Sequence, residues 1–138
     1  MIVERVSVSG GSGTINADGK VVRPELQQAL RIALATGQLR RPLSATLRPL
    51  LDLLADGDYE LHGPEPLADG VDLVPTGDWP PSDEARVTYY RTAIRTHHKP
   101  VAVLLHSGDQ VFIVDGHHKI AAYRAEGAQP TTVRLVVN

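Results

Sequence analysis

The sequence predicts an α+β protein built from short helices and strands. Two continuous apolar runs, at 101–105 and 111–114, are typical of buried strands, whereas apolar residues within 26–34 and 87–94 recur at helical spacing. The chain has 138 residues with 12 Gly and 10 Pro, so turns must be frequent. Because 42% of the residues are hydrophobic and 22% are charged, we expect a folded core.

The first 70 residues are expected to form a small β-hairpin followed by two helices. A strand is predicted at 2–8, where two valines alternate with serines. Residues 10–22 hold two glycine turn signals and two short apolar segments, which favours an antiparallel hairpin or meander. Two segments with leucines at helical spacing, 24–37 and 47–54, then predict an αα-hairpin.

A stretch dense in Gly and Pro, 57–81, follows these helices. Short strands fit between its turn residues, at 59–62 and at 71–74. We place a domain boundary near the middle of this stretch, close to residue 70. The chain is thereby divided into an N-terminal region, 1–70, with no assigned role, and a C-terminal domain, 71–138.

The C-terminal domain is expected to contain a helix at 83–98. Ser82 can cap this helix, and Asp83 and Glu84 fall in its first turn, where the helix dipole favours acidic side chains. The helix must end before Pro100, because proline disfavours helical geometry in the residue that precedes it.

Two buried strands, a short helix and a last strand complete the expected domain. The strands are the apolar runs at 101–105 and 111–114, and the helix is the alanine-rich segment that ends at Gly127. Residues 131–137 have the β-branched composition of a final strand.

The motif Asp115-Gly116-His117-His118-Lys119 joins the second buried strand to the short helix. The first amide groups of a helix and the positive end of its dipole favour anions. Gly116 lets the backbone approach a ligand, and His117, His118 and Lys119 add side-chain donors, so the motif has the composition of a phosphate site. Asp115 could cap the helix, hold a sugar hydroxyl or ligate Mg²⁺. The alternative is that Asp115 is only an N-cap and that the histidines are ordinary surface residues.

The order strand, Asp-Gly-His-His-Lys, alanine-rich helix, Gly, strand over 111–137 resembles the core of the ParB/sulfiredoxin-like superfamily. ParB-like nuclease members of that superfamily carry Asp-Gly-His-His-Arg. The strand at 71–74 resembles the opening strand of the family, and the helix followed by Lys-Pro-Val matches the family's entry into its next strand. The resemblance covers roughly half of the chain and implies a mixed sheet with helices.

The resemblance implies that this loop binds a nucleotide. Partition ParB proteins bind CTP there, sulfiredoxins bind ATP, and free serine kinases use ADP or ATP, so we expect ATP, ADP or CTP, with Mg²⁺ held by Asp115. His117 stands where sulfiredoxins place a catalytic cysteine, which excludes peroxiredoxin repair. No helix-turn-helix segment follows the motif, so chromosome partitioning is not expected.

Free serine kinases resemble this chain better than the other members do. They pair the loop with a carboxylate at the start of the preceding helix, where Asp83 and Glu84 fall. The resemblance thus implies phosphoryl transfer to a small hydroxyl substrate, with Asp115, His117 and either Asp83 or Glu84 as catalytic residues. Whether the chain is an enzyme is left open.

Basic residues gather in the helix that precedes the motif. No acidic residue lies between Ala85 and Ser107, and Arg91 and Arg95 are one helical turn apart. We expect these two arginines to help hold a phosphate-bearing ligand, unless they only solvate the helix. The alternative function is a ParB-like nuclease or nucleic-acid-binding protein whose basic helix meets the phosphate backbone.

The remaining features of the sequence limit the class of partner. A net charge of −2 argues against a surface built to coat nucleic acid. No apolar run reaches the length of a membrane span, so no membrane partner is expected. The chain has no Cys and no export signal, so the cytoplasm is the expected location, and no oligomeric state is predicted.

Trp79 either covers the edge of the core or stacks on a base.

Overall fold

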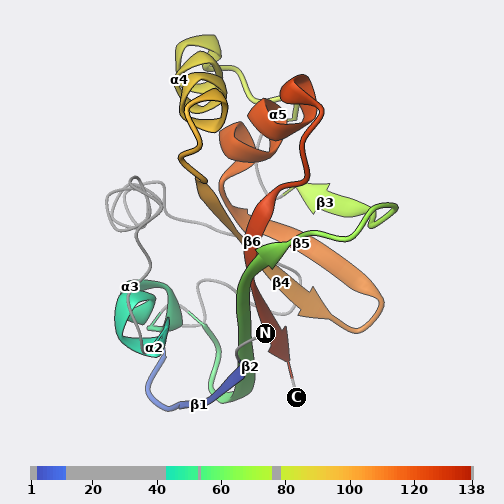
Figure 1. Ribbon diagram of the computed structural model, residues 1–138. Coiled ribbons are helices and arrows are strands. Elements are labelled where there is room, and N and C mark those ends of the chain that lie inside the picture. The colour runs from blue at the N-terminus through green and yellow to red at the C-terminus, as the bar shows by residue number, and fades with distance from the viewer. Residues whose placement is uncertain (1–2, 12–42, 53, 76–78, 138) are drawn as a thin grey trace.

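The computed structural model describes residues 3–11, 43–52, 54–75 and 79–137 (Figure 1). These ranges form a mixed six-stranded sheet with helices packed on it, so the predicted α+β class is confirmed. The hairpin predicted within 10–22 and the helix predicted at 24–37 lie almost entirely outside the described residues. In the part of the chain that is described, no helix has both the length and the apolar character needed to cross a membrane.

The sheet has the strand order β1-β2-β6-β4-β5-β3. Antiparallel pairs join β1 to β2, β2 to β6 and β4 to β5, and parallel pairs join β6 to β4 and β5 to β3. The strands are β1 (Val3–Val8), β2 (Gly57–Pro66), β3 (Leu73–Pro75), β4 (Val101–Ser107), β5 (Gln110–Asp115) and β6 (Thr131–Val137). The described helices are α2 (Leu43–Thr46), α3 (Arg48–Leu51), α4 (Glu84–Arg95) and α5 (His117–Glu126).

The sheet continues across the expected boundary near residue 70. Strands β1 and β2 come from the first 70 residues, and β2 pairs with the last strand, β6, so that Leu61 lies opposite Leu135. The division of the chain into two domains stays a prediction.

Two apolar clusters lie on the two faces of the sheet, because alternate side chains of a strand point to opposite sides. One face packs against leucines of the α2–α3 region, and its cluster includes Leu47, Leu50, Leu61, Val103 and Leu135. The other face packs against α5, and its cluster includes Leu67, Ala102, Leu104, Ile113 and Ile120. The sheet is therefore the central layer, with α5 held directly on β4 and β5.

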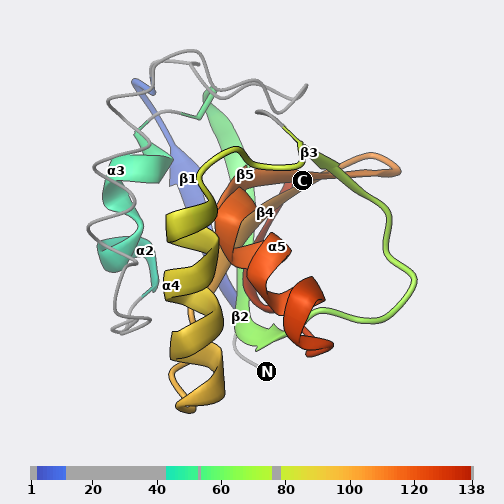
Figure 2. The same cartoon turned by 90° about the horizontal axis from the view of Figure 1, so that it is seen from above.

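Helices α4 and α5 lie side by side and begin at the same end of the molecule (Figure 2). Helix α4 begins one residue later than expected: Asp83 is its N-cap, and the Asp83 carboxylate accepts a hydrogen bond from the backbone N–H of Arg86 at 3.1 Å. The prediction that Ser82 caps the helix is wrong, because the helix begins at Glu84 and the capping position is therefore that of Asp83. The helix ends at Arg95, and His97 adopts a φ of 65° directly after it.

Candidate functional site

The predicted motif forms a sharp junction between β5 and α5. Strand β5 ends at Asp115, Gly116 has a φ of 98°, and α5 begins at His117. A Cβ at Gly116 would lie 2.9 Å from the Cβ of Ala102 on β4. Glycine is therefore needed here both for its backbone angle and for its close approach to β4. The first amide groups of α5 point out of its N-terminal end, where the helix dipole is positive.

Lys119 and Asp115 face the interior rather than the solvent. Lys119 is 1% exposed, and its Nζ donates a hydrogen bond of 2.9 Å to the carbonyl oxygen of Val101. The same Nζ lies 3.9 Å from Oδ2 of Asp115, which is 6% exposed, and 5.6 Å from the ring centre of Tyr90 on α4. Burial lowers the pKa of Lys119, and the Asp115 carboxylate opposes that shift. Lys119 thus links β4, β5 and α4 to the first turn of α5, and it does not extend toward a ligand.

The surroundings of Asp115 do not fit a magnesium site. Mg²⁺ is usually bound by one or two carboxylates together with substrate phosphates and water. Here the Asp115 carboxylate is buried next to the ammonium group of Lys119, which would repel a divalent cation. Among the described residues, no group of three or more His, Cys, Asp or Glu side chains is placed to hold a metal ion. The expectation that Asp115 holds Mg²⁺ therefore gains no support from this geometry.

His117 and His118 occupy the first turn of α5 and are half-buried. Burial, with a smaller effect of neighbouring His118, lowers the pKa of His117 to about 4. The His117 imidazole is consequently neutral near pH 7 and can donate one hydrogen bond. The Trp79 ring lies beside it, with a centroid distance of 6.4 Å.

The start of α4 lies at the same end of the molecule as the motif (Figure 2). Asp83 is exposed and engaged as the cap of its own helix, whereas Glu84 is an exposed first-turn residue. Arg86 is near enough to Lys119 to lower the pKa of that lysine further. Of the two predicted carboxylates, Glu84 is therefore the one that has no capping duty in the described structure.

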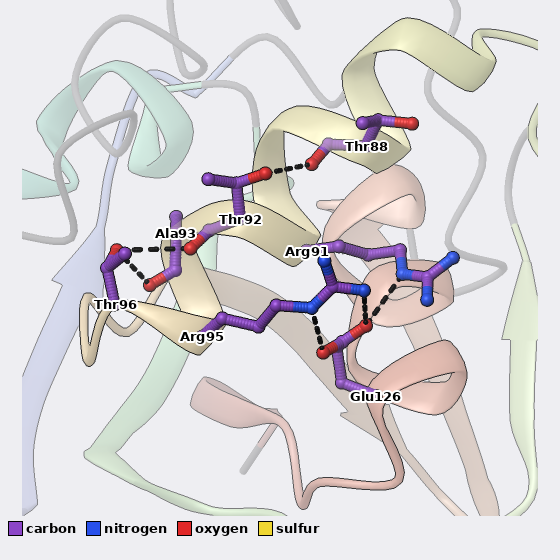
Figure 3. Close-up of polar contacts among 7 residues, drawn as sticks. All are labelled: Thr88, Arg91, Thr92, Ala93, Arg95, Thr96 and Glu126. Atoms are coloured by element: carbon purple, nitrogen blue, oxygen red, sulfur yellow. Dashed lines mark hydrogen bonds and ion pairs between the residues drawn. The ribbon is translucent and has the colours of Figure 1, made fainter.

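Arg91 and Arg95 bind Glu126 rather than lying open at the motif (Figure 3). Arg95 makes two hydrogen bonds to the Glu126 carboxylate, of 2.7 and 2.9 Å, and Nε of Arg91 makes a third at 2.7 Å. These contacts lower the pKa of Glu126 to about 2. Glu126 is the last residue of α5, which has ten residues and is therefore about 15 Å long. The two arginines thus lie at the end of α5 away from Gly116, and the expectation that they hold the phosphates gains no support.

The structure therefore brings together a smaller set of candidate residues than the sequence predicts. Gly116, His117 and His118 form the junction, with Trp79 beside it and Glu84 at the same end of the molecule. A hollow of about 290 Å³ lies elsewhere, lined by residues that include Val71, Arg124 and Gly127 but none of the motif.

Sequence reasoning missed two residues that contact predicted ones, Glu126 at the far end of α5 and Arg124 beside Trp79. Glu126 could have been anticipated, since Arg91 and Arg95 repel each other unless an anion lies between them. Arg124, which packs on Trp79, had no signal in the sequence, because their contact depends on the docking of distant segments.

No protein-family model, no curated protein and no solved structure matches this chain.

Proposed function

We propose that this chain binds a nucleotide or a similar phosphate-bearing small molecule at the N-terminal end of α5. The observation that carries the proposal is the junction itself: a buried strand leads into Gly116 at a φ of 98°, and a ten-residue helix begins at the next residue. Such an end combines outward-pointing amide groups with a positive dipole, which is the usual arrangement for holding phosphate.

His117 and His118 are the side chains that we assign to the ligand. Both are half-buried in the first turn of α5, next to the helix end at which an anion would bind. A phosphate next to His117 would raise its pKa and so favour the charged imidazolium. Lys119 has a different part in this proposal, since its buried contacts with Asp115 and Val101 fix the backbone of the turn.

The ParB/sulfiredoxin-like fold is part of the same proposal. It is supported by the mixed sheet, by the parallel pairing of β3 with β5 and by the placement of the motif between β5 and α5. The common end at which α4 and α5 begin also agrees with a carboxylate next to a phosphate loop. ATP, ADP and CTP all remain candidate ligands.

Phosphoryl transfer is the enzymatic form of the proposal. Glu84 would accept the proton of a substrate hydroxyl while the hydroxyl oxygen attacks the terminal phosphorus atom of the nucleotide, and the bond from that phosphorus to its bridging oxygen breaks, so that the nucleotide leaves with one phosphate fewer. His117, His118 and the first amide groups of α5 would hold the phosphate oxygens. The test is to measure turnover by the Glu84→Gln variant. Asp83→Asn is the matched control, and it should keep its turnover because asparagine caps a helix as well as aspartate does.

Loss of turnover in Glu84→Gln with retained nucleotide binding would support this role, whereas equal turnover in the wild type and Glu84→Gln would end it.

The nucleic-acid alternative gains no support from the structure. Two arginines of its basic helix, Arg91 and Arg95, bind the Glu126 carboxylate, which offsets one of their two positive charges.

Binding is tested by calorimetry with ATP, ADP and CTP, each with and without Mg²⁺. His118→Ala should lower the affinity about tenfold or more, since a hydrogen bond to a charged group contributes about 1.5–3 kcal/mol. His98→Ala is the matched control, because His98 is exposed beyond the far end of α4. The proposal fails if no nucleotide binds, or if both variants bind as the wild type does.

A further inference from the structure

Trp79, the only tryptophan of the chain, lies along one side of α5. Its ring centroid is 6.4 Å from that of His117, and the guanidinium carbon of Arg124 is 5.3 Å from the indole centroid. His117 and Arg124 are two helical turns apart and therefore lie on the same side of α5. The indole thus lies near both the His117 imidazole and the Arg124 guanidinium.

The indole is held in place and yet partly exposed. The guanidinium of Arg124 lies over the ring in a cation–π contact, which limits the positions that the indole can adopt. Trp79 nevertheless keeps 37% of its surface exposed. Apart from Trp79, the described large hydrophobic side chains with this much exposure are Val3, Tyr89 and Val137, and these belong to β1, α4 and β6. The Trp79 ring lies beside His117, the first helical residue of the motif.

We infer that Trp79 is the stacking surface for the aromatic base of the ligand. The inference rests on the proposed function, since the phosphates at the end of α5 would bring the base to the adjacent indole. A flat, pre-positioned indole with exposed ring area gains most from a second flat ring, and a neighbouring guanidinium strengthens such stacking. Trp79 thereby selects base-bearing phosphates over inorganic ones.

The inference is tested by comparing two ligands, ADP and inorganic pyrophosphate, by calorimetry. Trp79→Leu should lower the affinity for ADP roughly tenfold, because loss of a stacked aromatic ring has an effect of this order. The affinity for pyrophosphate should stay unchanged, since pyrophosphate has no base. Trp79→Phe should recover most of the ADP affinity because it keeps a flat ring.

Tyr89→Leu is the matched control. It removes an aromatic ring that is 63% exposed and packs edge-on against Tyr90, so ADP and pyrophosphate should both bind as they do to the wild type. Thermal melts of all variants show whether each remains folded, and Trp79→Phe keeps the test valid if Trp79→Leu does not fold.

The outcomes separate the inference from the proposed function. If the wild type binds pyrophosphate and ADP, and substitution of Trp79 weakens both equally or neither, the stacking role is wrong and the phosphate site stands. If the wild type binds neither ligand, nor any other nucleotide, both proposals fail. An intrinsic fluorescence change upon ADP binding that pyrophosphate does not produce would support the stacking role independently, since Trp79 is the only tryptophan.

Discussion

Nζ of Lys119 lies 3.9 Å from Oδ2 of Asp115, and both side chains are buried below the first turn of α5. Two residues of one five-residue motif therefore form a buried ion pair, while the three residues between them are half-buried. The pair fixes how the amide groups of the turn are presented. This arrangement explains why a lysine stands in the motif without extending toward solvent.

Removal of the lysine should destabilise the protein strongly. Lys119→Met leaves the Asp115 carboxylate buried next to an apolar group, and loss of one partner of a buried pair costs about 3–5 kcal/mol. Urea denaturation measures the change in the free energy of unfolding. The double variant Asp115→Asn, Lys119→Met should regain part of that loss, and a double variant less stable than Lys119→Met would contradict the pairing.

Gly116→Ala should destabilise the protein more than Gly108→Ala. Both glycines have positive φ angles, of 98° and 60°, so both substitutions strain the backbone. The alanine Cβ at position 116 would also lie 2.9 Å from the Cβ of Ala102, whereas nothing lies within 4 Å at position 108. Chemical denaturation should show an additional loss of about 1–3 kcal/mol for Gly116→Ala, and equal losses would disprove the close contact with β4.

Glu126→Gln should weaken the packing of α4 on α5. The contacts with Arg91 and Arg95 lower the folded-state pKa of Glu126 to about 2, so its stabilising effect is complete above the ordinary glutamate pKa of 4.5 and is lost as the pH falls toward 2. Melting temperatures should therefore be lower in Glu126→Gln at pH 7 by a few degrees, and the difference should disappear at low pH. The conservative control is Asp109→Asn in the exposed β4–β5 turn. An unchanged melting temperature in Glu126→Gln would show that these ion pairs contribute nothing.

His117 should make the protein less stable in mild acid. Its folded-state pKa is about 4, below the ordinary histidine value of 6.5, so the unfolded chain binds a proton more readily between these pH values. Stability should therefore fall as the pH drops from 6.5 to 4, by about 1–2 kcal/mol after allowance for solvent screening. His117→Gln should flatten this part of the pH profile, and an unchanged profile would contradict the neutral, half-buried imidazole.

The strand–motif–helix unit could be predicted because its signals are local. The apolar run that becomes β5, Gly116 and the alanine-rich segment that becomes α5 are adjacent in sequence, and each has its own pattern. The pairing of β1 with β2 had no such signal, since more than 40 residues separate the strands and a strand pattern does not name its partner. The cap of α4 was misplaced by one residue because Ser82 and Asp83 are both good caps.

The candidate site could be predicted in place but not in detail. The sequence locates the turn at 115–119, yet it does not show that Lys119 points inward, because burial of a lysine depends on β4 and α4. The sequence also led us to expect Arg91 and Arg95 next to the ligand. The structure instead pairs both with Glu126 at the far end of α5, and this pairing depends on how α4 packs on α5, which the sequence does not show. The directions of these side chains could thus not be predicted, because they depend on tertiary packing.

The most direct test of the phosphate site is to follow backbone amide chemical shifts by NMR while pyrophosphate, and then ADP, is added. Both ligands should shift the amide signals of residues 116–119 most, since these groups form the N-terminal end of α5. Residues at the far end of the helix, such as Glu126, should shift little. If the largest changes occur at Arg91, Arg95 and Lys99, or if no amide of the motif responds at saturating ligand, the site is not at the start of α5.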